Sequence, residues 1–226
     1  MASTLHPSTL ANSSVKDPGA YHHRNLRPAL IAAAREALET VAPESISLKA
    51  LAAQLGVSQP APYRHFSSRE VLLTAVATDG FEQFTAALAE AAGKGPEGER
   101  FERACRAYLR FASRYPGLYR LMFASHLLKT ATDPSLGYAS KTAFDQLLHL
   151  LKKLIAPELV NVTAIWVWST LHGLVMLEAE GLTSATLTQK VTPGDVVQHM
   201  IATLSGTPRS RKGTKKNAPM KTSTRK

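Results

Sequence analysis

The sequence contains a single cysteine, Cys105, among its 226 residues. One thiol cannot form a disulfide within the chain, so we expect a protein of a reducing cytoplasm rather than a disulfide-stapled secreted domain. The N-terminus lacks the basic stretch and apolar run of a secretory signal. The sequence also lacks the alternation of β-branched and polar residues that is typical of strands, which predicts an all-α fold.

Signatures of catalysis are missing as well. The sequence has no glycine-rich phosphate loop, no HExxH and no CxxC. Its eight histidines are scattered, and a lone histidine on an apolar helix is more often a hydrogen-bonded core residue than a base or a metal ligand. We therefore expect no enzyme activity, no catalytic residues, no metal site and no cofactor.

Acidic residues are fewer than basic ones, and the basic excess lies mainly at one end of the chain. Of 27 Lys and Arg residues, eight follow Gly206, in a stretch that has no acid. The rest of the chain holds 19 bases against 17 acids. Such a tail attracts phosphates in a salt-sensitive way that does not depend on sequence. The alternative is a solvated tail without a role.

One long apolar run is present, from Leu159 to Leu177, and it has no charged residue over 19 positions. It is long enough to span a bilayer. However, polar residues interrupt it, and acids flank it where basic anchors are expected for a membrane helix. A helix that is apolar nearly all round is also typical of one buried on two sides, which is the interpretation we favour.

The stretch 46–66 predicts two short helices joined by a tight turn. Ser47 is a good N-cap because its hydroxyl can accept a backbone N–H, and an apolar stripe follows it. Gly56 comes after the stripe, where a helix favours positive φ. Ser58 can cap the second helix, whose first turn tolerates Pro60. This order occurs in some all-α cores, and it is that of a helix-turn-helix, whose second helix lies in the DNA major groove.

The residues that follow strengthen the helix-turn-helix interpretation. Ser67 and Glu70 are spaced as the capping box of a further helix. Over residues 22–73 the sequence resembles the tetracycline-repressor (TetR) family of bacterial regulators. The residues that carry this resemblance are Leu55, Gly56, Val57, Ser58, Tyr63, His65, Phe66, Ser68, Arg69, Glu70 and Leu72.

In that family the second helix of the motif enters the major groove, and here it corresponds to about residues 59–66. The resemblance places Gln59 where its amide can read an adenine edge, and Pro60 and Ala61 where they face a thymine methyl. Pro62 stands where many relatives carry a β-branched residue or leucine, which leaves the local helix geometry open. The expected DNA-binding residues are Arg24, Ser47, Lys49, Ser58, Gln59, Pro60, Ala61, Tyr63, Arg64, His65 and Arg69.

Members of this set differ in the contact we expect of them. Tyr63 and His65 are placed for phosphate contact, and Arg64 can reach a base or the backbone. Ser47, Lys49 and Arg69 stand at helix starts and suit phosphates, because free N–H groups and a positive helix end favour anions. Phe66 is expected in the core.

Composition divides the chain into four parts. We predict a disordered arm (1–20), a helix-turn-helix DNA-binding domain (21–73), a helical effector-binding and dimerisation domain (74–205) and a disordered basic tail (206–226). Val41 and Val71 are expected to face inward, and Asp133-Pro134 to open a loop. Apolar periodicity predicts helices over 26–41, 48–55, 68–92, 101–115, 118–128, 144–155, 158–180 and 192–204.

The C-terminal half has a fainter signature of its own. Residues 115–123, and Trp168 to Gly173, resemble a TetR subgroup with a Trp…His-Gly motif on the dimer-forming helix. This resemblance implies a homodimer formed through the helices near 158–180 and 192–204. It also implies a pocket for a small-molecule effector.

Aromatic residues are concentrated in this half, while charged ones are few. An apolar pocket with a few polar groups is the usual small-molecule site, so we expect a largely apolar effector. The alternative is that the same residues form a filled core. The expected effector-binding residues are Tyr108, Phe111, Tyr119, Met122, Phe123, His126, Trp168, His172 and Met176.

Three functions stay open at this point. The first is a homodimeric, ligand-responsive transcriptional regulator, usually a repressor, which acts on an operator in double-stranded DNA within the bacterial cytoplasm, at the nucleoid. The second is a helical architectural DNA-binding protein without an effector, which would show little preference for one operator. The third is an all-α small-molecule-binding enzyme whose helix-turn-helix is vestigial.

Overall fold

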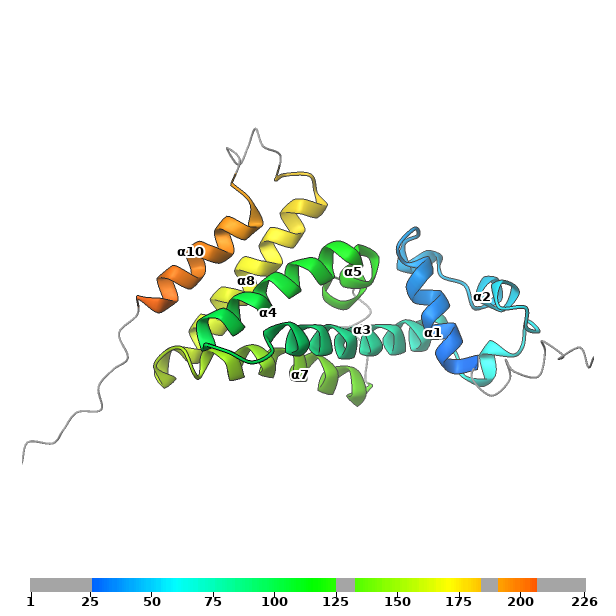
Figure 1. Cartoon of the computed structure of the whole chain (residues 1–226). Helices are drawn as coiled ribbons and strands as arrows, with labels where there is room; N and C mark the ends of the chain where they lie inside the picture. The colour runs from blue at the N-terminus through cyan, green and yellow to red at the C-terminus, as the bar shows by residue number, and fades with distance from the viewer. Residues whose placement is uncertain (1–25, 125–132, 184–190, 207–226) are drawn as a thin grey trace, which may run out of the picture.

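The computed structural model describes residues 26–124, 133–183 and 191–206, and in this part of the chain all regular structure is helical (Figure 1). The all-α prediction is confirmed. The predicted arm (1–20) and the tail beyond Gly206 lie outside the described residues. The elements are α1 (Leu26–Ala37), η1 (Pro43–Ser45), α2 (Leu48–Gln54), η2 (Pro62–Arg64), α3 (Arg69–Ala92), α4 (Glu97–Arg114), α5 (Pro116–Ala124), α7 (Pro134–Leu151), η3 (Pro157–Leu159), α8 (Val160–Ala179) and α10 (Pro193–Ser205).

A small head is formed by α1, α2 and η2 packed around the first turn of α3; we use this name for residues 26–73. Its core contains Leu30, Leu51, Phe66 and Leu72, each at most 3% exposed. The apolar stripes of α1 and α2 supply the first two of these residues, as predicted, and Phe66 is in the core as expected. In Figure 1, α2 lies at the end of the molecule opposite α10.

The first helix is shorter than predicted, because α1 ends at Ala37 rather than at Val41. The backbone N–H and the hydroxyl of Thr40 both donate to the carbonyl of Ala37, at 3.0 and 3.1 Å, which closes a turn. Ala42 is extended (φ −66°, ψ 151°), as a residue before proline prefers. Val41 is thereby turned outward and is 42% exposed, so its predicted inward position is wrong.

The long helix α3 connects the head to the rest of the molecule. Its N-cap is Ser68, whose hydroxyl accepts the N–H of Val71 at 3.3 Å. The capping box predicted for Ser67 and Glu70 is therefore wrong, because the cap is Ser68 and the third helical position after it is Val71. Val71 is 44% exposed, contrary to prediction, whereas Leu72 is fully buried. Beyond this first turn α3 packs against α4, α5 and α7.

The helices α4, α5 and α7 pack around the second half of α3, α8 packs on α4 and α7, and α10 packs on α4. We call residues 74–205 the body. Along α3 runs α7, which begins ten residues before the predicted 144–155. The Asp133 carboxylate accepts the N–H of Ser135 at 2.9 Å and caps the helix. Pro134 follows at the first helical position, where its fixed φ favours the helix. The predicted loop at these residues is wrong, because they start a helix.

The apolar helix α8 has one buried side. With η3 it forms a helix, Pro157–Ala179, that is long and apolar enough to cross a membrane by length and composition, a test that core helices also pass. Val162 and Ile165 on its other side are 64% and 51% exposed. Within one chain α8 is thus covered on one side rather than on two. The buried stripe consists of Val160, Ala164, Val167, Leu171 and Val175.

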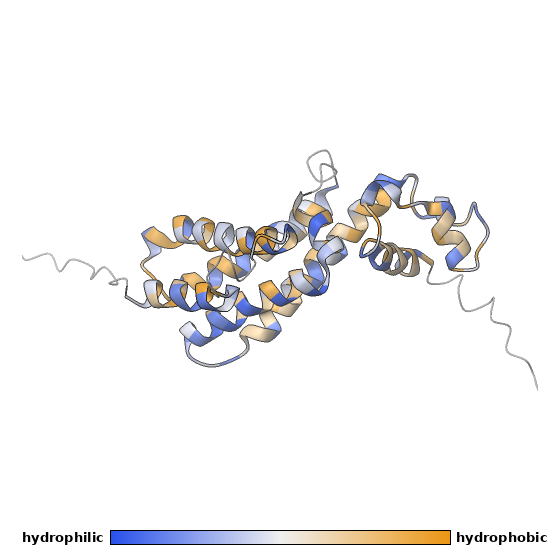
Figure 2. Cartoon of the chain, turned by 90° about the horizontal axis from the view of Figure 1, so that it is seen from above, coloured by the Kyte–Doolittle hydropathy of each residue, from blue (hydrophilic) through white to orange (hydrophobic). Residues whose placement is uncertain are grey.

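The last described helix, α10, lies over the predicted range 192–204, and Thr192 is its N-cap. The Thr192 hydroxyl accepts the N–H of Asp195 at 3.2 Å, and the Asp195 carboxylate accepts the N–H of Thr192 at 2.8 Å. Val197, Met200 and Leu204 are buried, and α10 packs on α4. Figure 2 shows polar and apolar residues alternating along the body helices, as amphipathic helices require.

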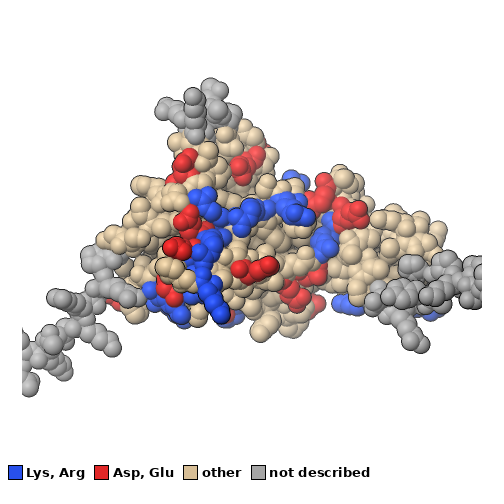
Figure 3. Space-filling view, viewed as in Figure 1, with Lys and Arg blue, Asp and Glu red and all other residues tan. Residues whose placement is uncertain are grey.

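Charged residues gather on the face of the body shown in Figure 3, where blue side chains run over the region of α4. Acids accompany many of these bases. Arg100 pairs with Glu97 at 2.8 Å and Arg106 with Glu102 at 2.9 Å. This mixture agrees with the near balance of bases and acids outside the tail.

Candidate DNA-binding face and effector cavity

The first half of the motif folds as its sequence predicts. Ser47 caps α2 by accepting the N–H of Ala50 at 3.5 Å. Gly56 follows the helix with φ +66°, a conformation that glycine adopts without strain. The N–H of Val57 then bonds to the carbonyl of Ala52 at 3.0 Å and closes the turn. These bonds fix the direction in which the chain leaves α2.

The second half differs from the predicted helix over residues 59–66, which we call the recognition segment. It consists of turns and the 3-10 helix η2. The N–H of Ala61 bonds three residues back to Ser58, at 2.9 Å, and that of Tyr63 to Pro60, at 3.2 Å. Pro62 has no N–H to donate back to Ser58, and a bond with the four-residue spacing of an α-helix appears at the end of the segment, from the N–H of Phe66 to the carbonyl of Pro62 at 3.0 Å. The expected Ser58 cap does not form on η2, because the N-cap of η2 is Ala61 and no side chain caps it.

The expected DNA-binding residues mostly lie on the surface. Pro62 and Phe66 anchor the recognition segment in the head, and both are buried. Ala61 and Arg69 are half-buried, and Arg24 lies outside the described residues. The exposed members of the set are Ser47, Lys49, Ser58, Gln59, Pro60, Tyr63, Arg64 and His65.

One arginine holds the recognition segment against α1, and a second joins the start of α3 to η1. The Arg27 guanidinium lies 4.7 Å from the centre of the Phe66 ring and donates to the carbonyl of His65 at 3.4 Å. Arg69 donates to the carbonyl of Glu44 at 2.6 Å and to the Glu70 carboxylate at 3.0 Å. The sequence analysis missed the contacts of Arg27, which have no local signal because they cross from α1 to η2.

A polar joint connects the head to α5. The Glu39 carboxylate accepts the N–H groups of Gly117 and Leu118, at 3.0 and 3.2 Å. These donors belong to the first turn of α5, where N–H groups lack partners within the helix. Gly117 lies so close to the head that a Cβ built on it would stand 1.9 Å from the carbonyl oxygen of Leu38. Nothing in the local sequence predicted this contact between segments so far apart in the chain.

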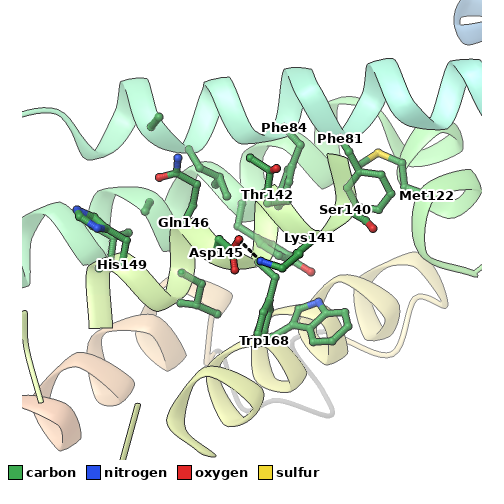
Figure 4. A pocket seen from close by; sticks show the side chains of 18 of the residues that line it. Phe81, Phe84, Met122, Ser140, Lys141, Thr142, Asp145, Gln146, His149 and Trp168 are labelled. Atoms are coloured by element: carbon green, nitrogen blue, oxygen red, sulfur yellow. Dashed lines mark hydrogen bonds and ion pairs between the residues drawn. The ribbon is translucent and has the colours of Figure 1, made fainter. Parts of the chain in front are cut away.

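The body contains a cavity of about 1160 Å³, between α3, α4, α7 and α8 and next to α5. Figure 4 shows its side chains in a row along α3 and α7, from Phe81 and Met122 at one end to His149 at the other. Most of its wall is apolar. The ion pair between Lys141 and Asp145 stands at its exposed edge.

The expected effector-binding residues divide into two groups. Tyr108, Met122, Phe123 and Trp168 line the cavity. His126 lies outside the described residues. Phe111, Tyr119, His172 and Met176 are not part of the cavity wall, and the first two are buried. The walls that sequence analysis did not name are α3, with Phe81 and Phe84, and nearly the whole of α7.

Behind this wall, three polar side chains form a hydrogen-bonded chain. The hydroxyls of Tyr108 and Tyr119 are 2.6 Å apart, and the Tyr119 hydroxyl is 2.7 Å from Nδ1 of His172. Burial raises the pKa of Tyr108 to about 12, also raises that of Tyr119, and lowers the pKa of His172. All three groups are therefore neutral near pH 7, and the chain joins α4, α5 and α8.

The sequence was compared with known families and proteins. Residues 30–76 match the family described as bacterial regulatory proteins, tetR family, and residues 101–204 match the tetracyclin repressor-like C-terminal domain. An uncharacterized HTH-type transcriptional regulator of Mycobacterium tuberculosis is 28% identical over 140 residues, or 62% of this chain and 63% of that protein. The chain thus matches less than two thirds of that relative's length.

Solved structures agree with this assignment. A protein of unknown function from Rhodococcus sp. RHA1 is 30% identical, with a TM-score of 0.71 over 84% of this chain and 97% of its own. A TetR variant from Acinetobacter baumannii AYE in complex with minocycline has the same fold, at 23% identity and a TM-score of 0.52, over 83% of this chain and 96% of its own. The chain belongs to the TetR family of bacterial transcriptional regulators.

Proposed function

We propose that the chain is a homodimeric transcriptional repressor, which leaves a near-palindromic operator when a small apolar effector fills the cavity. One observation carries this proposal: the cavity and the helix-turn-helix are joined by two helices. α3 runs from Arg69 in the head to Ala92 at the cavity wall. α5 bonds to Glu39 through its first turn and lines the cavity with Met122 and Phe123.

The recognition segment is the part that reads DNA in this proposal. Gln59 and Arg64 are exposed and address base edges, whereas Tyr63 and His65 address phosphates. The start of α2, with Ser47 and Lys49, offers free N–H groups to a further phosphate. We no longer assign a phosphate contact to Arg69, since its guanidinium is already bonded to Glu44 and Glu70 within the head.

A partner subunit covers the outer side of α8. The exposed apolar residues there include Val162, Ile165 and Trp166, and contiguous exposed apolar residues are typical of interaction surfaces. The stripe of α10 contributes less than the sequence analysis expected, because it packs on α4 of its own chain. A two-fold dimer of this kind places two recognition segments about 34–36 Å apart, one DNA turn, or a little more.

The Trp…His-Gly subgroup also belongs to this proposal. Trp168 lines the cavity, and His172 bonds to Tyr119 behind it. A Cβ added to Gly173 would have no atom within 4 Å in the single chain, which leaves room for the close approach of a partner helix. These features support a dimer helix that also senses the cavity.

The alternatives differ in what they leave unexplained. An architectural DNA-binding protein has no use for a cavity of this size, and a cytoplasmic enzyme has no use for an exposed helix-turn-helix. The minocycline complex of the Acinetobacter relative supports a small-molecule role for the helical body. We therefore assign no enzyme activity to the chain and place it in the cytoplasm.

The test is a selection of bound sequences from random DNA with the full chain, combined with light scattering. The proposal expects one near-palindromic consensus and the mass of a dimer, or a pair of dimers, at micromolar concentration. A monomer contradicts the dimer. Binding without a consensus favours the architectural alternative, and no binding at low salt leaves a small-molecule-binding protein.

A further inference from the structure

The shape of the cavity carries information about the effector beyond its polarity. The lining residues on α3 run from Phe81 to Ala92, and those on α7 from Pro134 to Leu150. At a rise of 1.5 Å per residue, the α3 wall alone is about 16 Å long. Figure 4 shows the labelled side chains following these two helices in a row rather than gathering around one point. The cavity is therefore elongated along α3.

Deep in the cavity there is no ionised partner for a charged ligand. The buried part of its wall consists of apolar side chains from α3, α4, α5, α7 and α8, together with Cys105 and Tyr108. Burial raises the pKa of both groups to about 12, so both are neutral. The Tyr108 hydroxyl is already bonded to Tyr119. A charge placed here would be buried unpaired, at a high cost in free energy.

Charged groups lie instead at the edges of the cavity. The side chains of the Lys141–Asp145 pair are 71% and 48% exposed. Arg100, near the Ala92 end, is bonded to Glu97 and to the carbonyl of Gly93. A polar ligand group therefore finds water and charged neighbours at these edges, while the fully buried part of the wall offers a charged group no partner.

We propose that the effector is a linear amphiphile, with an alkyl or acyl chain lying along α3 and a polar head at the edge of the cavity at its Ala92 end, near Arg100. This inference rests on the proposed function and deepens it by naming a ligand class. With C–C bonds of about 1.5 Å and angles near 111°, an extended chain advances about 1.25 Å per carbon. A wall of about 16 Å thus accommodates about 13 carbons.

The test is a titration of the full chain with straight-chain alkanols and alkyl carboxylates of about 6 to 16 carbons, each below its micelle concentration. Tryptophan fluorescence reports binding, because Trp168 lines the cavity. The affinity should rise about fourfold with each added CH₂ and stop rising near the length of the wall. Alkanol and carboxylate of equal length should differ little, since the head stays in water.

A variant shortens the cavity from within. Ala104 lines it from α4, and Ala104→Phe should end the rise several carbons earlier, because the ring takes the place of that part of the chain. Ser113→Phe is the matched control: Ser113 is a small residue on the same helix, is exposed and does not line the cavity. It should leave the length profile unchanged. If Ala104→Phe does not fold, the dependence of affinity on chain length in the wild-type protein tests the proposal by itself.

Affinity that is independent of chain length, or that rises without a limit, overturns this inference, as does an unchanged profile in Ala104→Phe. Operator release is measured separately. Release by a compact ring compound with no binding of alkyl chains rejects the linear amphiphile and keeps the repressor. Length-limited binding of alkyl chains to a protein that selects no operator keeps the ligand class and rejects the repressor.

Discussion

In the head, most of the described residues expected to meet DNA are exposed and stand on a backbone fixed by nearby hydrogen bonds. In the body, the residues expected to meet an effector are mostly buried and lie in or behind the wall of a cavity. The head's surface follows from short-range signals such as Ser47, Gly56 and the two prolines of the recognition segment. The body's cavity follows from how α3, α4, α7 and α8 fail to fill the space between them. The first kind of site can be located in a sequence, whereas the second has to be seen in a structure.

The largest effect is expected at the joint between the two regions. Gly117→Ala places a Cβ 1.9 Å from the Leu38 oxygen and 2.5 Å from its carbonyl carbon. Both atoms belong to the backbone, so α5 must move away from the head. We expect a loss of about 3 kcal/mol in the free energy of unfolding, at the upper end for overpacking, measured by urea denaturation.

Gly98→Ala is the control for that substitution. Gly98 lies in the first turn of α4, where an added Cβ has no atom within 4 Å. Alanine there should leave stability unchanged or raise it by about 0.5–1 kcal/mol. If both variants lose stability equally, the contact between α5 and the head is not a tight one.

Within the head, Arg64 and Tyr63 should separate base contact from phosphate contact. Arg64→Ala should cost about 1–3 kcal/mol of operator affinity and relax specificity at one position, if its guanidinium meets a base. Tyr63→Phe should weaken all DNA sequences by a similar factor. A selection from random DNA with each variant gives the answer, and equal, sequence-independent losses would make Arg64 a backbone contact.

A smaller effect is expected from Glu39, which tests whether the two regions communicate. Glu39→Gln removes the charge that accepts two N–H groups of α5, at a cost of about 1 kcal/mol in stability, since the site is exposed. The change in operator affinity on effector binding should shrink. Glu36→Gln on α1 is the control and should alter neither quantity. Full coupling in Glu39→Gln would assign communication to α3 alone.

The smallest effect concerns His172. Burial lowers its pKa below the ordinary value of 6.5, so the unfolded chain takes up a proton more readily than the folded one. The folded state therefore loses stability as the pH falls below about 6.5 and keeps it above that value. Urea midpoints of His172→Asn should fall less steeply over this range than those of the wild type. Parallel curves would mean that His172 titrates as it does in the unfolded chain.

Part of this architecture was predictable from the sequence. The helical class, the cap at Ser47 and the core position of Phe66 follow from local periodicity and capping chemistry. Errors in the bounds of helices arose where a neighbouring signal prevailed. Asp133-Pro134, for example, has the composition of a loop and the chemistry of a helix start. The α-helix predicted for the recognition segment is replaced by turns and a 3-10 helix, in which Pro62 lacks the N–H for a bond back to Ser58.

The candidate sites were predictable to different extents. The expected DNA-binding residues share a local motif, and most of those described are exposed. Of the expected effector-binding residues, only those on the inner sides of α4, α5 and α8 line the cavity. Phe81, Phe84 and the α7 wall were missed because a stripe of apolar residues looks the same whether it faces a filled core or a cavity. Their role depends on packing between helices that are far apart in the chain, which a local sequence pattern does not predict.

The central claim is that cavity occupancy and DNA binding exclude one another through α3 and α5. The most direct measurement is the affinity of a cavity-filling ligand, taken from the alkyl series or from a fluorescence screen, for the free protein and for the protein saturated with its operator. We predict that operator DNA weakens the ligand by the same factor by which the ligand weakens DNA, about 5- to 150-fold. Equal affinity of the ligand for the free and the operator-bound protein would contradict the account.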